Sequence, residues 1–141
     1  MTQQPVQQPQ RPVPLPDEAS QPFFDGAQRG VLMIRRCNSC GTHLHPATEM
    51  CPECLDDDLA WVESSGRGTI FTFGVMHQNY HPAFTDDLPY NVTVVELEEG
   101  PRLNTNIVDV PNDEIEVGMS VEVMFEEVAE GVKLPKFRPV G

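Results

Sequence analysis

The chain has 141 residues with 22 Asp and Glu against 9 Lys and Arg, which gives a formal net charge of -13 at pH 7. A surface this acidic disfavours nucleic-acid binding, because phosphate backbones are normally held by a basic face. No stretch approaches the roughly 18 apolar residues of a membrane helix, and the first residues lack the pattern of a secretory signal, so we expect a cytoplasmic protein without a membrane segment.

Residues 1–19 predict a disordered leader. They are rich in Gln and Pro and show neither the period of a helix nor that of a strand. Such a composition buries too little apolar surface to offset the entropy of the chain. The rest of the chain is long enough for a small metal-bound module joined to a barrel-sized domain.

Residues 20–30 predict a short helix. Its end signals are Ser20 as N-cap, Pro22 in the first turn and Gly30 as the C-terminal stop. Gly26 should weaken the helix by about 1 kcal/mol. Because so short a helix is marginal in isolation, we expect Phe23 and Phe24 to dock it on the ribbon that follows or on a partner chain.

Residues 31–63 predict a zinc ribbon of short strands separated by two metal-binding turns. All four cysteines lie here, as two Cys-x-x-Cys pairs separated by ten residues: Cys37, Cys40, Cys51 and Cys54. Clustered cysteines in a cytosolic chain indicate a metal rather than disulfides. Gly41, directly after the first pair, supplies the permissive backbone that such a turn needs.

Four thiolates complete the tetrahedron of a zinc ion, which leaves no position for a reactive water. We therefore predict a structural Zn²⁺, with iron or a redox-active dithiol as the alternatives. His43 and His45 lie between the pairs and could compete as ligands, but with four cysteines present we interpret them as ordinary ribbon residues.

Residues 64–141 predict a five-stranded antiparallel barrel of the oligonucleotide/oligosaccharide-binding (OB) fold. β-branched and aromatic residues are enriched in five segments, 68–77, 90–98, 102–110, 120–128 and 131–139. The segment between the third and fourth has room only for a turn or a single helical turn. Pro135 within the fifth suggests an edge position or a bulge.

The connection between the first two barrel strands, residues 77–90, is long and rich in aromatic and titratable side chains. Its candidate partner-contacting or substrate-lining residues are His77, Tyr80, His81, Phe84 and Tyr90. No nucleophile with an orienting partner can be assigned here, so we predict no catalytic residue. An inert loop and a catalytic loop are the alternatives.

Positive charge is scarce, and two cations of the last strand, Lys136 and Arg138, are expected on one face because alternate strand residues share a face. They could contact the phosphates of an anionic cofactor. Ordinary solvated charge is the alternative interpretation.

The segments FFDGAQRGVLMIRRCNSCG, CPEC, WVESSGRGTIFTFGVMH, PYNVTVVELEEGPRL and VKLPKFRPV resemble a zinc-ribbon plus OB-fold family that accompanies acyl-CoA thiolases, lipid-transfer-protein-like aldolases and MaoC-like hydratases. The resemblance covers all but the leader. It implies a mainly β protein with a helical N-terminal hook, a rubredoxin-like zinc ribbon and an OB-fold barrel packed on a thiolase-fold partner.

The same resemblance implies that the partner supplies the catalytic residues and that this chain helps to shape an acyl-CoA site, with Lys136 and Arg138 as candidate contacts to the CoA phosphates. Among the partners, it favours a thiolase or an aldolase acting on steroid side-chain CoA esters. By analogy with thiolase dimers, we expect a heterotetramer. The alternative functions are a nucleic-acid-binding barrel and an independent acyl-CoA-binding or catalytic protein.

Overall fold

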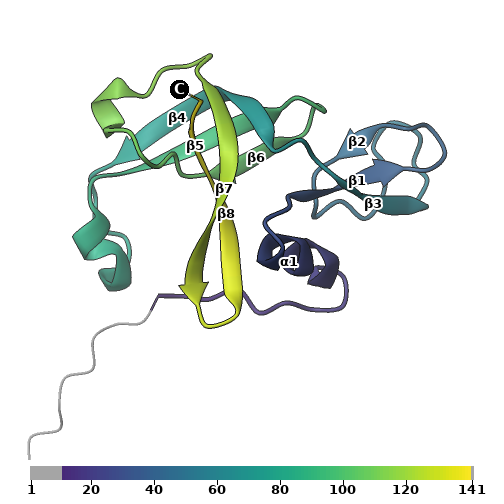
Figure 1. Ribbon diagram of the computed structural model, residues 1–141, viewed down its shortest axis with the longest axis horizontal. Coiled ribbons are helices and arrows are strands. Elements are labelled where there is room, and N and C mark those ends of the chain that lie inside the picture. Colours follow the sequence, from purple (N-terminus) through teal and green to yellow (C-terminus); the bar gives the residue numbers. More distant parts are fainter. Residues whose placement is uncertain (1–10, 141) are drawn as a thin grey trace, which may run out of the picture.

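Two antiparallel sheets follow one another along the chain in the computed structural model, which describes residues 11–140 (Figure 1). The first ten residues of the predicted leader lie outside the described residues. The smaller sheet follows helix α1 (Gln21–Gln28), and its order is β2-β1-β3, with β1 at Met33–Cys37, β2 at His43–Leu44 and β3 at Leu59–Glu63. This is the predicted zinc ribbon.

The larger sheet is the predicted OB-fold barrel, and its order is β6-β5-β4-β7-β8. Its strands are β4 (Arg67–Met76), β5 (Tyr90–Leu97), β6 (Arg102–Thr105), β7 (Ser120–Ala129) and β8 (Val132–Pro139). Short 3-10 helices, η1 (Pro82–Asp87) and η2 (Asn112–Glu114), follow β4 and β6. The sheet closes where Ile107 pairs in parallel with Phe137. The prediction of a mainly β fold with a ribbon and an OB-fold is confirmed.

Strand β4 curls the barrel. It pairs with β5 from Gly68 to Met76 but with β7 only over Arg67–Thr69, and its register with β5 shifts between Ile70 and Thr72. A bulge of this kind bends a strand and increases its twist. Pro135 lies in β8, at the end of the strand order, as its missing N–H predicts.

The third barrel strand is shorter than predicted. The sequence suggested pairing up to residue 110, but β6 ends at Thr105. The buried Asn91 side chain binds the backbone of Ile107 instead, with Nδ2 donating to its carbonyl at 2.8 Å and Oδ1 accepting from its N–H at 2.7 Å. On the β5 side, the Asn91 side chain thus takes the place of the β5 backbone as the partner of Ile107, while the segment still pairs with β8 through Phe137.

The ribbon and the barrel share one hydrophobic core. Leu32 and Ile34, at the start of the ribbon, are 1% and 0% exposed and belong to the same cluster as the barrel residues. The buried barrel members of that cluster are Ile70, Val95, Leu97, Leu103, Ile107, Ile115, Val121 and Phe137. Phe23 of α1 packs against the cluster, so the helix docks within its own chain.

Helix α1 ends as predicted and begins differently. Gly30 adopts a left-handed φ of 77°, and its N–H donates to the carbonyl of Ala27. Ser20 occupies the N-cap position, but its hydroxyl accepts from the Asp17 N–H at 3.0 Å instead of capping the helix. The Asp17 carboxylate accepts in return from the Ser20 N–H at 2.8 Å, so the predicted cap is used by the preceding turn.

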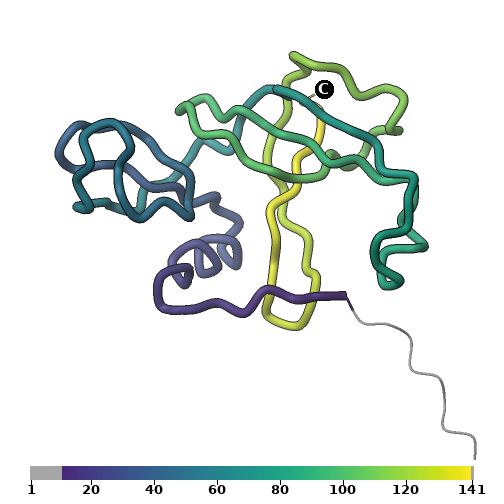
Figure 2. The backbone as a smooth tube through the Cα atoms, turned by 180° about the vertical axis from the view of Figure 1, so that it is seen from behind, coloured from purple at the N-terminus to yellow at the C-terminus, as the bar shows by residue number. Residues whose placement is uncertain are grey.

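The described part of the leader, residues 11–19, runs from α1 past the β7–β8 turn toward η1 (Figure 2). Its far end is held by Arg11, which forms an ion pair with Asp87. Near the same turn, Gln28 of α1 donates from Nε2 to the carbonyl of Gly131 at 2.7 Å. Over residues 11–140, no helix has the length and apolar character needed to cross a bilayer.

Candidate functional site

The four cysteine sulfurs form a compact cluster at the end of the ribbon away from the barrel. All four Sγ atoms lie within 4.8 Å of one another, and Cys37 to Cys54 and Cys40 to Cys51 are 3.5 and 3.6 Å apart. With Zn–S bonds of about 2.3 Å, a tetrahedral site has sulfur atoms about 3.8 Å apart. The cluster therefore fits a Zn²⁺ ion, as predicted, and holds the ribbon together.

Each cysteine pair sits on a turn of the same design. The Gly41 N–H donates to the Cys37 carbonyl and the Leu55 N–H donates to the Cys51 carbonyl, both at 2.8 Å. Both donors have positive φ, 78° at Gly41 and 64° at Leu55. Sequence reasoning found the first of these residues but missed the second, because leucine rarely adopts this conformation.

The four sulfurs do not share one tendency to ionise. The Asp56 backbone lowers the pKa of Cys54, but the hydrogen bonds with the other cysteines, together with burial, outweigh it and raise this pKa to about 12, whereas the pKa of Cys40 is lowered. The hydrogen bond from the Thr42 hydroxyl, at 3.1 Å, and one from its backbone lower the pKa of Cys40 to about 6. The candidate metal group among residues 11–140 consists of the four cysteines, and His45 instead accepts from the Ala47 N–H at Nδ1. Four protein ligands leave no open position, so the chemistry of this donor set is structural.

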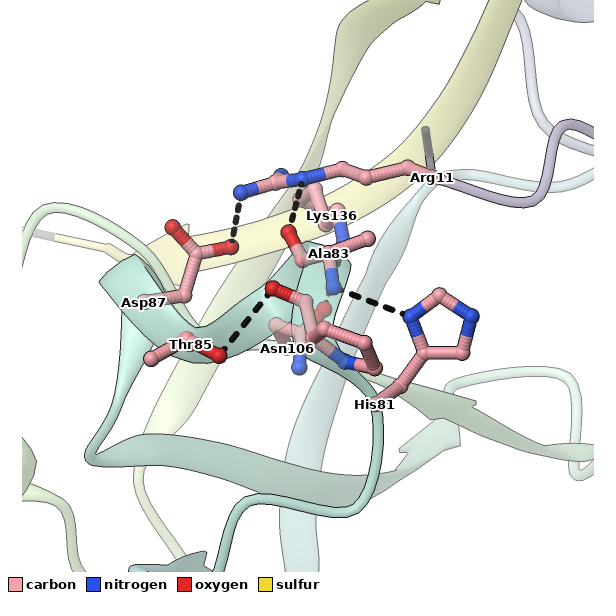
Figure 3. Close-up of polar contacts among 8 residues, drawn as sticks. Arg11, His81, Ala83, Thr85, Asp87, Asn106 and Lys136 are labelled. Atoms are coloured by element: carbon pink, nitrogen blue, oxygen red, sulfur yellow. Dashed lines mark hydrogen bonds and ion pairs between the residues drawn. The ribbon is translucent and has the colours of Figure 1, made fainter. Parts of the chain in front are cut away.

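The long connection after β4 is ordered by its own side chains. His81 Nδ1 accepts from the Ala83 N–H at 3.0 Å and so caps η1 (Figure 3). The His81 ring also lies edge-on to Phe84, with centroids 5.6 Å apart. His77 and Tyr80 are exposed at the start of the connection, whereas Tyr90 is half-buried at its end. The candidate residues are therefore split between an outer surface and an inner wall.

The inner wall belongs to a cleft of about 450 Å³ between this connection and the β7–β8 hairpin. Its floor is an amide network in which Asn91 Nδ2 donates to Asn112 Oδ1 at 3.2 Å and Asn106 Nδ2 donates to the Asn91 carbonyl. Lys136 donates from Nζ to Asn106 Oδ1 at the edge of this network. Phe84 and Tyr90 add aromatic surface to the cleft.

The two cations predicted to act together on β8 have different surroundings. Lys136 lines the cleft, but Arg138 does not, and Arg138 donates from Nε to Glu122 Oε1 at 3.1 Å. The second cation that lines the cleft is Arg11, which lies in the predicted leader. Sequence reasoning missed Arg11, because nothing in a Gln/Pro-rich segment indicates where its basic side chain lies.

The two aromatic side chains of α1 meet edge to face, with ring centroids 5.3 Å apart. Both are half-buried. Phe23 packs against the shared core and also lines a second pocket of about 250 Å³ with Leu103 and Phe137 of the barrel.

Two family models match consecutive parts of the chain. One is described as the rubredoxin-like zinc ribbon domain of ChsH2 and matches residues 24–60. The other is described as the C-terminal OB-fold domain of ChsH2 and matches residues 61–126. Their boundary falls within β3, the last strand of the ribbon sheet.

Three similar proteins extend this result. A probable enoyl-CoA hydratase alpha subunit of Thermomonospora curvata is 40% identical and covers 98% of this chain, but the match spans only 43% of that protein. A DUF35 domain-containing scaffold protein of Methanocaldococcus jannaschii is 35% identical over 73% of each chain. The solved structure named "Ltp2-ChsH2(DUF35) aldolase" has a TM-score of 0.78 at 40% identity and covers 89% of this chain and 98% of that chain.

Proposed function

The chain belongs to the zinc-ribbon and OB-fold family of ChsH2 and the DUF35 scaffold proteins, and on this premise we propose that it is a non-catalytic accessory subunit of an acyl-CoA thiolase or thiolase-like aldolase. The observation that carries the proposal is the likeness to a chain of the solved structure named "Ltp2-ChsH2(DUF35) aldolase", which extends over 98% of that chain. The subunit stabilises a thiolase-fold partner and helps to shape the site for its CoA ester.

The zinc ribbon contributes rigidity to this role. The four Cys ligands leave the ion no position for substrate, so a bound zinc holds the fold of the ribbon together instead of taking part in a reaction. The chemical step then belongs to the partner subunit. In this chain, Nδ1 of His81 already accepts the hydrogen bond that caps η1, which favours a structural role for this histidine.

We assign the partner contact to the exposed start of the 77–90 connection. Tyr80 is 65% exposed and is the largest exposed side chain there, and tyrosine is enriched where binding energy concentrates in interfaces. His77 and His81 flank it. Phe24 is proposed as a second anchor on α1, with Phe23 supporting it from the core side.

Co-expression tests the proposal. A tagged form of this chain is produced together with a candidate thiolase-like protein, and any complex is isolated and sized by light scattering. We expect a heterotetramer that cleaves or condenses a CoA ester, and no turnover by this chain alone. Absence of co-purification, with the activity of the thiolase-like protein unchanged, would contradict the proposal.

Point variants test the assigned surface. Tyr80→Ser should weaken assembly by at least about tenfold, as truncation of a central interface tyrosine commonly does. Val117→Ser is the matched control, because Val117 is also 65% exposed but follows η2. Equal assembly of both variants would show that the partner binds elsewhere.

A hydratase partner is the second candidate. The Thermomonospora relative is named as a hydratase alpha subunit, and its match covers 98% of this chain. The same co-expression experiment with a hydratase-type partner separates the two candidates by the reaction that the complex catalyses. A third function, nucleic-acid binding by the barrel, conflicts with the net charge of -13, and a gel shift at low salt measures it directly.

A further inference from the structure

The cleft contains a cation whose charge is not balanced by an ion pair. Lys136 is half-buried, and its ammonium donates to the neutral amide oxygen of Asn106. Within residues 11–140 it has no ion-pair partner, although Glu126 also lines the cleft. An ammonium carries three donors, so Lys136 retains two for a ligand.

Arg11 lines the same cleft and is held there against η1 (Figure 3). Its Nη2 lies 2.5 Å from Asp87 Oδ2, its Nε donates to the Ala83 carbonyl at 3.3 Å, and its guanidinium lies 5.1 Å from the centroid of the Phe84 ring. These contacts hold an otherwise extended segment against η1. The Arg11 side chain is still 48% exposed, so it can be reached by a ligand.

The floor of the cleft is already formed. Asn91 is 5% exposed, and its side chain is fully engaged with Ile107, Asn112 and Thr93. A network in which each buried polar group has a partner fixes the shape of a site. The cleft therefore offers a preformed floor together with two cations in its lining.

We propose that this cleft binds a phosphate-type oxyanion between Arg11 and Lys136, and that Asp87 competes with the ligand for Arg11. The guanidinium offers paired N–H donors to phosphate oxygens, and the ammonium of Lys136 adds a second positive charge. The inference rests on the proposed function, in which the anion is a phosphate of the CoA ester. The sequence predicted Arg138 as the partner of Lys136, but Arg138 is paired with Glu122 outside the cleft, and the proposed site uses Arg11 in its place. Arg11 lies before both segments that the family models match.

The charges of the cleft set the expected strength. Asp87 and Glu126 also line it, so an incoming anion meets two carboxylates as well as two cations. We expect weak binding by the chain alone, with a dissociation constant on the order of 1 mM. Removal of the Asp87 charge should strengthen binding, because the anion no longer competes for Arg11.

The test is a titration of the full chain with inorganic pyrophosphate, and in a second arm with CoA, followed by amide NMR shifts. Arg11→Gln and Lys136→Gln should each weaken binding by about fivefold to tenfold, as the loss of a charge-assisted contact does. Asp87→Asn should strengthen it by about threefold. Arg138→Gln, on the same strand as Lys136, is the matched control and should leave the affinity unchanged, and a melting curve for each variant shows that it is folded.

The signs of these changes decide the result. Equal affinity of Arg11→Gln and the parent chain, or weaker binding by Asp87→Asn, would overturn the proposal, because either would give Arg11 a structural role alone. Binding of pyrophosphate through Arg11 by a chain that fails to assemble with any partner would support the site and reject the proposed function. Assembly with a thiolase-like partner by a chain that binds no anion would support the proposed function and reject the anion site.

Discussion

Two glycines of β4 differ in what a side chain would meet. A Cβ at Gly68 would lie 2.8 Å from Val95 Cγ1 and closer still to the backbone carbonyl of Glu96, whereas nothing lies within 4 Å of a Cβ at Gly74. Neither residue has a positive φ. Gly68 is therefore required by the close approach of β5, and Gly74 is not required by any contact within the described chain.

This contrast gives a matched pair of substitutions. Gly68→Ala should lower the free energy of unfolding by about 2 kcal/mol, because the strand must shift away from β5 to admit a methyl group. Gly74→Ala should leave it unchanged or raise it by up to about 0.5 kcal/mol, because alanine loses less entropy on folding. Urea unfolding of both variants measures the difference, and similar losses would contradict this account.

At the level of residues, the sequence predicts ligands better than it predicts partners. The Cys-x-x-Cys spacing alone identified the metal-binding cluster, because two tight turns bring their sulfurs together wherever the rest of the chain goes. The partner of Asn91 depended on the path of residues 106–112, and the contact between Arg11 and Asp87 joins residues 76 positions apart. Local pattern carries no information about such pairs.

Among the elements, the ribbon depends on its metal more than on apolar contacts. The buried cluster around the two cysteine turns consists of Cys37, Cys51 and Leu44, with Leu59 packed against it. So few apolar side chains cannot fold a module alone, whereas structural zinc contributes on the order of 10 kcal/mol in small zinc domains at pH 7.

Removal of the ion should therefore unfold the distal ribbon first. After chelation, we expect amide hydrogen exchange to accelerate in β2 and in the two cysteine turns, while the β5 amides keep their protection from exchange. Elemental analysis should find one equivalent of zinc in the parent chain and in His45→Ala, because His45 is outside the sulfur cluster, and should find none in Cys51→Ser. Zinc retained by Cys51→Ser at full stoichiometry would contradict the four-ligand site.

The elements also show why local signals predicted positions but not every detail. All five barrel segments became strands, because alternating β-branched residues fit a half-buried sheet.

Gly26 was expected only to weaken α1. The structure gives it a reason, since a Cβ there would lie 2.9 Å from the Val31 carbonyl and clash with Met33 of β1. Helix and ribbon approach so closely only because this residue has no side chain.

In the whole molecule, two neighbouring carboxylates of the β5–β6 turn, Glu98 and Glu99, hold the segment between the two sheets. Glu99, in the β5–β6 turn, accepts from the Ser64 hydroxyl at 2.9 Å and from the Ser65 N–H at 2.7 Å, just after β3. Burial raises the pKa of Glu99, but these two hydrogen bonds, together with one from its own backbone and the attraction of His43, outweigh it and hold the pKa below its ordinary value of 4.5. The contact between the β5–β6 turn and the segment after β3 thus depends on the ionised form of the Glu99 carboxyl group.

The direction of this shift predicts a pH dependence. Because the folded-state pKa is lowered, the stabilising contribution of Glu99 is complete above its ordinary value of 4.5 and is lost as pH falls through the folded-state value. Glu99→Gln should cost about 1 kcal/mol at pH 7 and progressively less below pH 4.5.

Urea unfolding of the parent chain and Glu99→Gln across this pH range measures the effect. Glu130→Gln is the control, because Glu130 is exposed in the β7–β8 turn and makes no hydrogen bond or ion pair with residues 11–140. A difference between the parent chain and Glu99→Gln that stays constant with pH would show that this contact does not depend on the charge of Glu99.

The position of Leu32 and Ile34 inside the barrel core restricts how such proteins can be recombined. A chimera joined at residues 60 and 61 would bring a foreign ribbon whose two core side chains must fill space shaped by Val95 and Phe137. Mismatched volumes there would leave a cavity or a clash. Successful hybrids between relatives should therefore inherit both sheets from one parent and exchange only what lies before the helix.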